Sequence, residues 1–163
     1  MKIRAGGQTG ADRGALEAAR DLGVHYGGWV PFNRKAEDGQ VPLDFENMRE
    51  TSVSGYGART HLNVRYSDAT LLITLMRGAD MTKGSRLTQE ICQLRGKPLL
   101  ILSASWVLAD AHGQAVDVVR WLRRVGPSPE LNVAGTRESK CPGIQAATRR
   151  LVTRVLELWE EKE

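Results

Sequence analysis

The chain contains few residues of the kinds that form cross-links or bind metal ions. Only two of its 163 residues are cysteines, Cys92 and Cys141, too few for a disulfide framework or a structural zinc site. Its three histidines show no metal-site spacing, and no Ser–His–Asp arrangement can be identified. We therefore expect no metal site made of protein ligands and no serine-hydrolase triad.

Long apolar runs are also lacking. None reaches the roughly 18 residues that a membrane-spanning helix needs. The first residues lead directly into a glycine-rich motif and show no signal-peptide pattern. These two absences predict a cytoplasmic protein without a membrane segment.

The excess of charge is small. The chain has 23 basic and 19 acidic residues, a formal net charge of +4. The basic residues are dispersed and form no stripe with aromatic residues, so the charge gives no support for nucleic-acid binding. A modest positive excess suits a small anionic ligand. The length corresponds to a single domain over residues 1–163.

Apolar segments of strand type alternate with segments of helical periodicity. Strands are predicted at residues 3–5, 25–30, 69–76, 98–102 and 131–134. Helices are predicted at residues 11–22, 59–66 and 84–95, along an apolar stripe over 116–125, and from residue 144 onward. This order predicts an α/β fold, an open parallel sheet with helices on both faces.

The connections that leave the predicted strands are mostly longer and more polar than those that enter them. They cover residues 6–10, 31–57, 77–84, 103–114 and 135–143. In an open parallel sheet all of these exits lie at the carboxyl edge, where ligands bind. We therefore expect these loops to converge on one site.

The first loop has the sequence Gly6-Gly7-Gln8-Thr9-Gly10. Glycines between a strand and a helix allow close approach of a ligand, and the N–H groups of residues 7–11 would attract an anion, most often phosphate. The loop has neither the three-glycine dinucleotide fingerprint nor the lysine of a Walker loop. A tight turn that simply requires glycine is the alternative. We predict that Gly10→Val damages binding more than stability.

Three further segments carry candidate contacts. Asp12 follows the first loop and could cap the helix or accept a hydroxyl or amino group of the ligand. The start of the helix near residue 84 offers Gly84, Ser85 and Thr88, for which plain capping is the alternative. The excursion over residues 31–57 and the helix after it offer Arg34, Lys35 and Arg59, which under the alternative are solvated and pair with Glu37 and Asp38.

The last loop contains Gly135, Arg137, Ser139 and Lys140. Arginine can bind phosphate or molybdate oxygens through two parallel hydrogen bonds. The alternative is a solvated charged loop. Cys141 in the same loop could be a soft ligand, but a lone loop cysteine is usually incidental.

Taken together, these motifs resemble the circularly permuted YpsA-like group of the SLOG superfamily, also called the molybdenum cofactor carrier family. The resemblance rests on Gly6 to Arg13, Gly28 to Pro31, Arg34 to Gly39, Arg59-Thr60 with Asn63-Val64, Ser67 to Thr70, and Leu131 to Gly135 with Arg137 to Ser139. It implies a Rossmann-like fold that binds a phosphorylated or nucleotide-like ligand, either molybdenum cofactor or a nucleotide. It also implies a homo-oligomer, a dimer or a tetramer.

The wider superfamily includes nucleoside-monophosphate phosphoribohydrolases with a Pro-Gly-Gly-x-Gly-Thr-x-x-Glu loop. If Gly84 is its second glycine, Glu90 falls in register as a weak candidate for a catalytic group. However, the other matching positions hold Thr82, Lys83, Arg86 and Leu87. The stretch Gly84-Ser85-x-x-Thr88 also looks like the DNA-processing protein A group.

The leading hypothesis is therefore a binding or carrier protein for a phosphorylated small molecule or oxoanion, with molybdenum cofactor as the first candidate. The alternatives are an enzyme that cleaves an N-glycosidic bond, a nucleotide sensor, and a nucleic-acid-associated module.

Overall fold

The computed structural model describes residues 1–75 and 81–161, and a six-stranded sheet forms its centre. All strand pairs of this sheet are parallel, in the order β5-β2-β1-β8-β6-β7. The strands are β1 (Lys2–Arg4), β2 (Tyr26–Val30), β5 (Met48–Glu50), β6 (Ala69–Thr74), β7 (Leu99–Ser103) and β8 (Glu130–Gly135).

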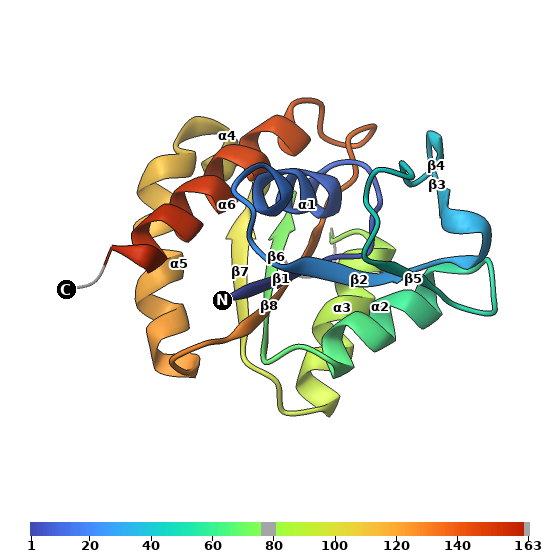
Figure 1. Cartoon of the computed structure of the whole chain (residues 1–163), viewed down its shortest axis with the longest axis horizontal. Helices are drawn as coiled ribbons and strands as arrows, with labels where there is room; N and C mark the ends of the chain where they lie inside the picture. The colour runs from blue at the N-terminus through green and yellow to red at the C-terminus, as the bar shows by residue number, and fades with distance from the viewer. Residues whose placement is uncertain (76–80, 162–163) are drawn as a thin grey trace.

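Helices cover both faces of the sheet (Figure 1). One face carries α1 (Ala11–Asp21), α4 (Ala104–Ala109), α5 (Ala111–Val125) and α6 (Ile144–Glu160). The other carries α2 (Tyr56–Arg65) and α3 (Lys83–Leu94), which pack against each other. The predicted α/β architecture, an open parallel sheet between two helical layers, is confirmed. No helix within residues 1–75 and 81–161 is long and apolar enough to cross a membrane.

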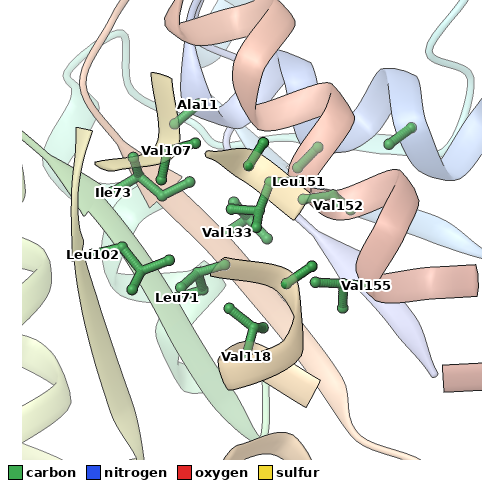
Figure 2. Close-up of a cluster of buried hydrophobic side chains, with 14 of the residues drawn as sticks. Ala11, Leu71, Ile73, Leu102, Val107, Val118, Val133, Leu151, Val152 and Val155 are labelled. Carbon is green, nitrogen blue, oxygen red and sulfur yellow. The ribbon is translucent and has the colours of Figure 1, made fainter. Parts of the chain in front are cut away.

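The main core lies between the sheet and the layer of α1, α5 and α6. All six residues of β6 are buried, as expected for a strand covered on both faces. Figure 2 shows Leu71 and Ile73 of β6 beside Val133 of β8, with Leu151 and Val155 of α6 packed against this surface. The alternation of side chains along β6 sends every second residue to this layer and the others toward α3.

The long excursion after β2 has more structure than the sequence predicted. It contains the short helix η1 (Phe32–Arg34), a hairpin of β3 (Lys35–Ala36) and β4 (Gly39–Gln40), and the edge strand β5. Segments of two or three residues are too short to show periodicity, so pattern reading missed them.

A second, smaller core holds this excursion in place. Val41 and Phe45 are fully buried against Ala5 and Leu16, next to Val30. The excursion therefore packs over the start of α1 and covers the glycine loop.

The prediction of a polar connection at residues 103–114 is wrong. The segment forms α4 and the first turn of α5. Ala104 and Val107 are fully buried in the main core, and Asp110 caps α5 by accepting the Gly113 N–H at 2.9 Å. The boundaries of two other elements differ from the predicted ones. Helix α2 begins at Tyr56 rather than residue 59, and strand β6 ends at Thr74 rather than residue 76. Met76 and residues 77–80 lie outside the described residues.

The chain order places a switch point at the carboxyl ends of β1, β8 and β6. From β1 the chain continues to β2 on one side, whereas from β6 it continues to β7 on the other. The last strand, β8, lies between these two halves. The order of strands therefore reverses direction around β8, and the carboxyl end of a sheet at such a point is where open α/β sheets bind ligands.

The contact between α1 and α6 makes a direct test of packing possible. A Cβ on Gly14 of α1 would overlap with the carbonyl oxygen of Gln145, whereas a Cβ on the helical Gly84 would meet nothing within 4 Å. We expect Gly14→Ala to lower the free energy of unfolding by about 1–3 kcal/mol. Gly84→Ala, the matched control, should leave it unchanged or raise it. Urea denaturation measures both, and equal stability of the two variants would contradict the packing.

Candidate functional site

A cavity of about 670 Å³ opens at the switch point, within the size range of small-molecule sites. Four segments that are distant in sequence line it: the glycine loop with the first turn of α1, the start of α2, the start of α3 with its cap, and the end of β8 with the loop after it. Their lining residues are Gln8, Asp12, Tyr56, Gly57, Arg59, Thr60, Thr82, Lys83, Gly84, Ser85, Leu87, Thr88, Ala134, Gly135, Thr136, Arg137 and Lys140. The expected convergence of strand exits is therefore observed for three of the five loops, with α2 as an additional wall. The structure brings together these predicted residues: Gln8, Asp12, Arg59, Gly84, Ser85, Thr88, Gly135, Arg137 and Lys140.

Gln8 lines this cavity and has a buried side-chain amide. Its Oε1 accepts hydrogen bonds from the backbone N–H groups of Thr9, at 3.1 Å, and Glu37, at 2.9 Å. Because only an oxygen can accept from two N–H groups, the orientation of the amide is determined. The Nε2 is then left buried without a partner among the described residues, and Gln8 is only 4% exposed.

Two other residues of the cavity wall have unpartnered polar atoms. The Thr136 hydroxyl and the Arg59 Nε are buried and form no hydrogen bond within the described residues. An unpaired buried polar group costs about 1–3 kcal/mol, which a bound ligand would recover. All three atoms, including Gln8 Nε2, are able to donate, so the wall is suited to a ligand rich in oxygen acceptors.

The cavity wall is positively charged. Among the described residues, four cationic side chains line it, Arg59, Lys83, Arg137 and Lys140, and Asp12 is the one carboxylate. Asp12 accepts from Arg59 at 2.8 Å. Burial raises the pKa of Asp12, and the charge and hydrogen bond of Arg59 oppose that effect.

The start of α3 is capped by a residue that sequence reasoning did not select. Thr82 accepts from the Ser85 N–H at 3.3 Å, and its hydroxyl donates to the Ser85 hydroxyl at 3.0 Å. Thr88 donates its hydroxyl to the Gly84 carbonyl at 3.1 Å, within the helix. Thr82 precedes the helix in the S/T position typical of caps, a signal that could have identified it.

The N–H groups of residues 8–11 are engaged within the protein. The N–H of Gln8 donates to Asp12, that of Thr9 to the Gln8 side chain, that of Gly10 to Gln145 at 3.1 Å, and that of Ala11 to the Thr136 carbonyl at 3.1 Å. The prediction that these groups are free to hold an anion is therefore wrong for residues 8–11. The loop is a buried turn, and it contributes the side chain of Gln8.

Gly10 is required for packing rather than for ligand approach. Its φ is 84°, and a Cβ there would overlap with the carbonyl oxygen of Thr136. The steric conflict argues against the prediction that Gly10→Val damages binding more than stability, because the substitution would separate the first loop from the last one. Gly6 and Gly7 are similar: a Cβ at Gly6 would overlap with Arg59, and one at Gly7 would crowd Val41.

The remaining predicted residues lie outside the cavity wall. Arg34 donates to three backbone carbonyls, those of Val41, Pro42 and Phe45, at 3.0, 2.6 and 3.0 Å, and so organises the excursion. Lys35 lies 5.5 Å from the centre of the Tyr56 ring. Glu90 is exposed on α3 and does not line the cavity.

Thr9 and Ser139 bind Glu37 of the excursion instead of facing the cavity. Glu37 accepts from the Thr9 hydroxyl and from both the N–H and the hydroxyl of Ser139, at 3.1 and 2.5 Å. Its neighbour Asp38 accepts two hydrogen bonds from Arg13, at 2.5 and 3.0 Å. The two carboxylates therefore clamp the excursion to the first and last loops, rather than pairing with Arg34 and Lys35.

Cys141 belongs to the core. It is 6% exposed and packs in the main cluster. Burial, and then the charge of Glu138, raise the pKa of its thiol. Within the described residues no group of three or more His, Cys, Asp or Glu side chains is placed to hold a metal ion.

A second cavity of about 670 Å³ lies over β1, β2 and β5. Its lining includes Arg4 and Glu130, which form an ion pair with each other, and Trp29, whose backbone groups bond to Asn63. It contains no glycine loop and no helix start, and none of the predicted site residues lines it. We therefore place the candidate site at the switch point.

Comparison with known proteins identifies the family of this chain. The circularly permutated YpsA SLOG family matches residues 3–156. The chain belongs to this family. A search of curated proteins gives no match.

One solved structure is similar over nearly its full length. It is the 1.45 Å crystal structure of a "putative molybdenum carrier protein" from Syntrophus aciditrophicus SB. The two chains are 37% identical, with a TM-score of 0.85, and the similarity covers 95% of this chain and 94% of that one.

The clamp formed by Glu37 and Asp38 predicts loss of stability in acid. Burial acts to raise the pKa of Glu37, but hydrogen bonds from Ser139 and Thr9 outweigh it, so the pKa lies below its usual value. The hydrogen bond from Arg13 lowers the pKa of Asp38. Carboxylates with lowered pKa stabilise the fold above their unfolded values, about 4.3 and 3.9, and this contribution is lost as pH falls through the folded values.

We therefore expect Glu37→Gln to lower the denaturation midpoint at neutral pH, with the difference from the parent shrinking below about pH 4. Denaturation curves over a pH series measure this. The exposed Glu160 is a suitable control, since Glu160→Gln should change nothing at either pH. A constant difference between parent and Glu37→Gln at all pH values would contradict the clamp.

Proposed function

We propose that this protein binds a phosphorylated small molecule or oxoanion at the switch-point cavity, as a carrier, with molybdenum cofactor as the leading candidate. The observation that carries this proposal is the set of unpartnered donors at Gln8, Arg59 and Thr136, in a wall whose described residues carry three net positive charges. Buried donors without partners are costly, and oxygen atoms of an anionic ligand would satisfy them.

The strength of such binding follows from the number of donors. Each hydrogen bond to a charged group is worth roughly 1.5–3 kcal/mol. Three or four of them, less the loss of ligand freedom, correspond to roughly micromolar affinity. That affinity serves a carrier or a sensor, and neither function requires a catalytic group.

The choice of molybdenum cofactor as first candidate rests on the family and on the similar protein described as a molybdenum carrier. This cofactor combines a pterin, one phosphate and a metal centre, and a cavity of about 670 Å³ has room for a ligand of that kind. We further propose that the carrier acts in the cytoplasm and, as the family resemblance implies, as a homo-oligomer. A nucleotide would use the same donors, so nucleotides belong among the ligands tested.

The position of Glu90 gives no support to hydrolysis. Its side chain is exposed and outside the cavity wall, and Asp12, the one carboxylate that the described residues place in the wall, is engaged by Arg59. If the protein nevertheless released adenine from AMP and Glu90→Gln abolished that release, the carrier proposal would be contradicted.

The proposal is tested by identifying and measuring the ligand. Mass spectrometry of native protein should reveal a co-purified phosphorylated compound. Calorimetry with molybdenum cofactor, molybdate, inorganic phosphate and AMP should show binding of at least one of them. If the protein binds none of these four compounds, the proposal is wrong.

The substitution Thr136→Val tests whether the hydroxyl in the cavity wall contributes to anion binding. Valine has the same shape but lacks the hydroxyl, and the hydroxyl has no partner within the described residues, so the fold should be kept. We expect affinity for the bound anion to fall by roughly tenfold or more. Thr148→Val is the matched control, because Thr148 also has an unpartnered buried hydroxyl but lies on α6 away from the cavity wall. Equal anion affinities of the two variants would exclude Thr136 from the site.

A further inference from the structure

Three cationic side chains surround one aromatic ring at the edge of the cavity. The Lys35 Nζ, the Arg59 Cζ and the Arg137 Cζ lie 5.5, 5.4 and 5.5 Å from the centre of the Tyr56 ring. They come from three different elements, namely β3, α2 and the loop after β8. Cations within about 6 Å of a ring are attracted by its electron-rich face. Tyr56, Arg59 and Arg137 also line the cavity.

The carboxylates nearby do not balance this cluster. Asp12 is an ion-pair partner of Arg59 at 2.8 Å, and Glu37 lies 3.8 Å from Arg137. Lys35 forms no ion pair within the described part of the chain. Three like charges around one ring repel each other, so the ring and these two carboxylates must hold them together. An anion with a single charge would leave part of that repulsion uncompensated.

Glu37 and the Tyr56 ring compete for Arg137. Glu37 is held in place by Thr9 and Ser139, and at 3.8 Å its contact with Arg137 is longer than a hydrogen bond. The ring keeps the guanidinium beside the cavity. Without the ring, Arg137 would close onto Glu37, and one positive charge of the wall would be neutralised internally.

We propose that Tyr56 is a positioning residue that holds Arg137 and Lys35 beside Arg59, and that the site thereby selects a dianionic group such as a phosphate monoester over a monoanion such as a phosphate diester. The inference rests on the proposed function, since it concerns the ligand of the same cavity. It assigns to Tyr56 an electrostatic role rather than a stacking one, because cations from three elements occupy the surroundings of its ring.

The test uses three probes at about pH 8, where a phosphate monoester is mostly dianionic. These are inorganic phosphate, dimethyl phosphate and AMP, measured by calorimetry at low ionic strength. We expect the wild type to bind inorganic phosphate at least about tenfold more tightly than dimethyl phosphate, which corresponds to about 1.4 kcal/mol. Tyr56→Leu should lose most of this preference, whereas Tyr56→Phe, which keeps the ring, should retain it.

A double-mutant cycle separates positioning from a general structural effect. If Tyr56 acts through Arg137, then Tyr56→Leu should have little further effect on phosphate affinity in an Arg137→Ala background. Thermal unfolding of Tyr56→Leu checks that the variant is folded. If it is not, Tyr56→His, which retains an aromatic ring, should preserve the preference for the dianion.

Different results overturn different statements. If Tyr56→Leu binds inorganic phosphate as the wild type does but binds AMP less tightly, the ring stacks on a base and the positioning role is wrong. Additive effects of Tyr56→Leu and Arg137→Ala would also overturn it. If the wild type binds none of the three probes, the inference fails, whereas the proposed function fails only if molybdenum cofactor and molybdate are not bound either.

Discussion

The Oε1 of Gln8 accepts two backbone N–H groups, from Thr9 and Glu37, and the rest of the site depends on this arrangement. One of the two bonds lies within the glycine loop, and the other ties the loop to the excursion that covers it. The same pair of bonds leaves Nε2, in a residue that lines the cavity, without a partner among the described residues. An interaction that fixes the fold therefore also fixes the chemical character of the wall.

The cavity differs from a typical phosphate loop in the source of its donors. Such loops usually offer main-chain N–H groups at a helix start. Here those groups are used to join three segments, because Gln145, Thr136 and Asp12 accept from the loop and the first turn of α1. The candidate donors are side chains, which can differ between family members without any change in the path of the chain. Ligand preference could then vary on a constant scaffold.

Much of the architecture could be predicted, because long apolar segments with clear periods specify β6, α3 and α6. The meeting of Gln8, the start of α3 and the loop at Arg137 also follows from the rule that parallel strands end at one edge. Three things could not be predicted. The first is the structure of the excursion, whose elements are only two or three residues long. The second is the use of N–H groups in the glycine loop by partners such as Gln145, which is distant in sequence. The third is the position of Tyr56 at the site, because this residue belongs to no recognised sequence motif. Each depends on long-range contacts that no local pattern records.

The position of β8 has a consequence for how the chain is made. This strand is near the end of the sequence, yet it lies in the middle of the sheet, paired with β1 and β6. During synthesis, both of those strands must therefore keep an open hydrogen-bonding edge until residue 135 has left the ribosome. Open edges of this kind can pair with other chains. Assembly of the nascent protein consequently depends on protecting two unfinished half-sheets until their central strand arrives.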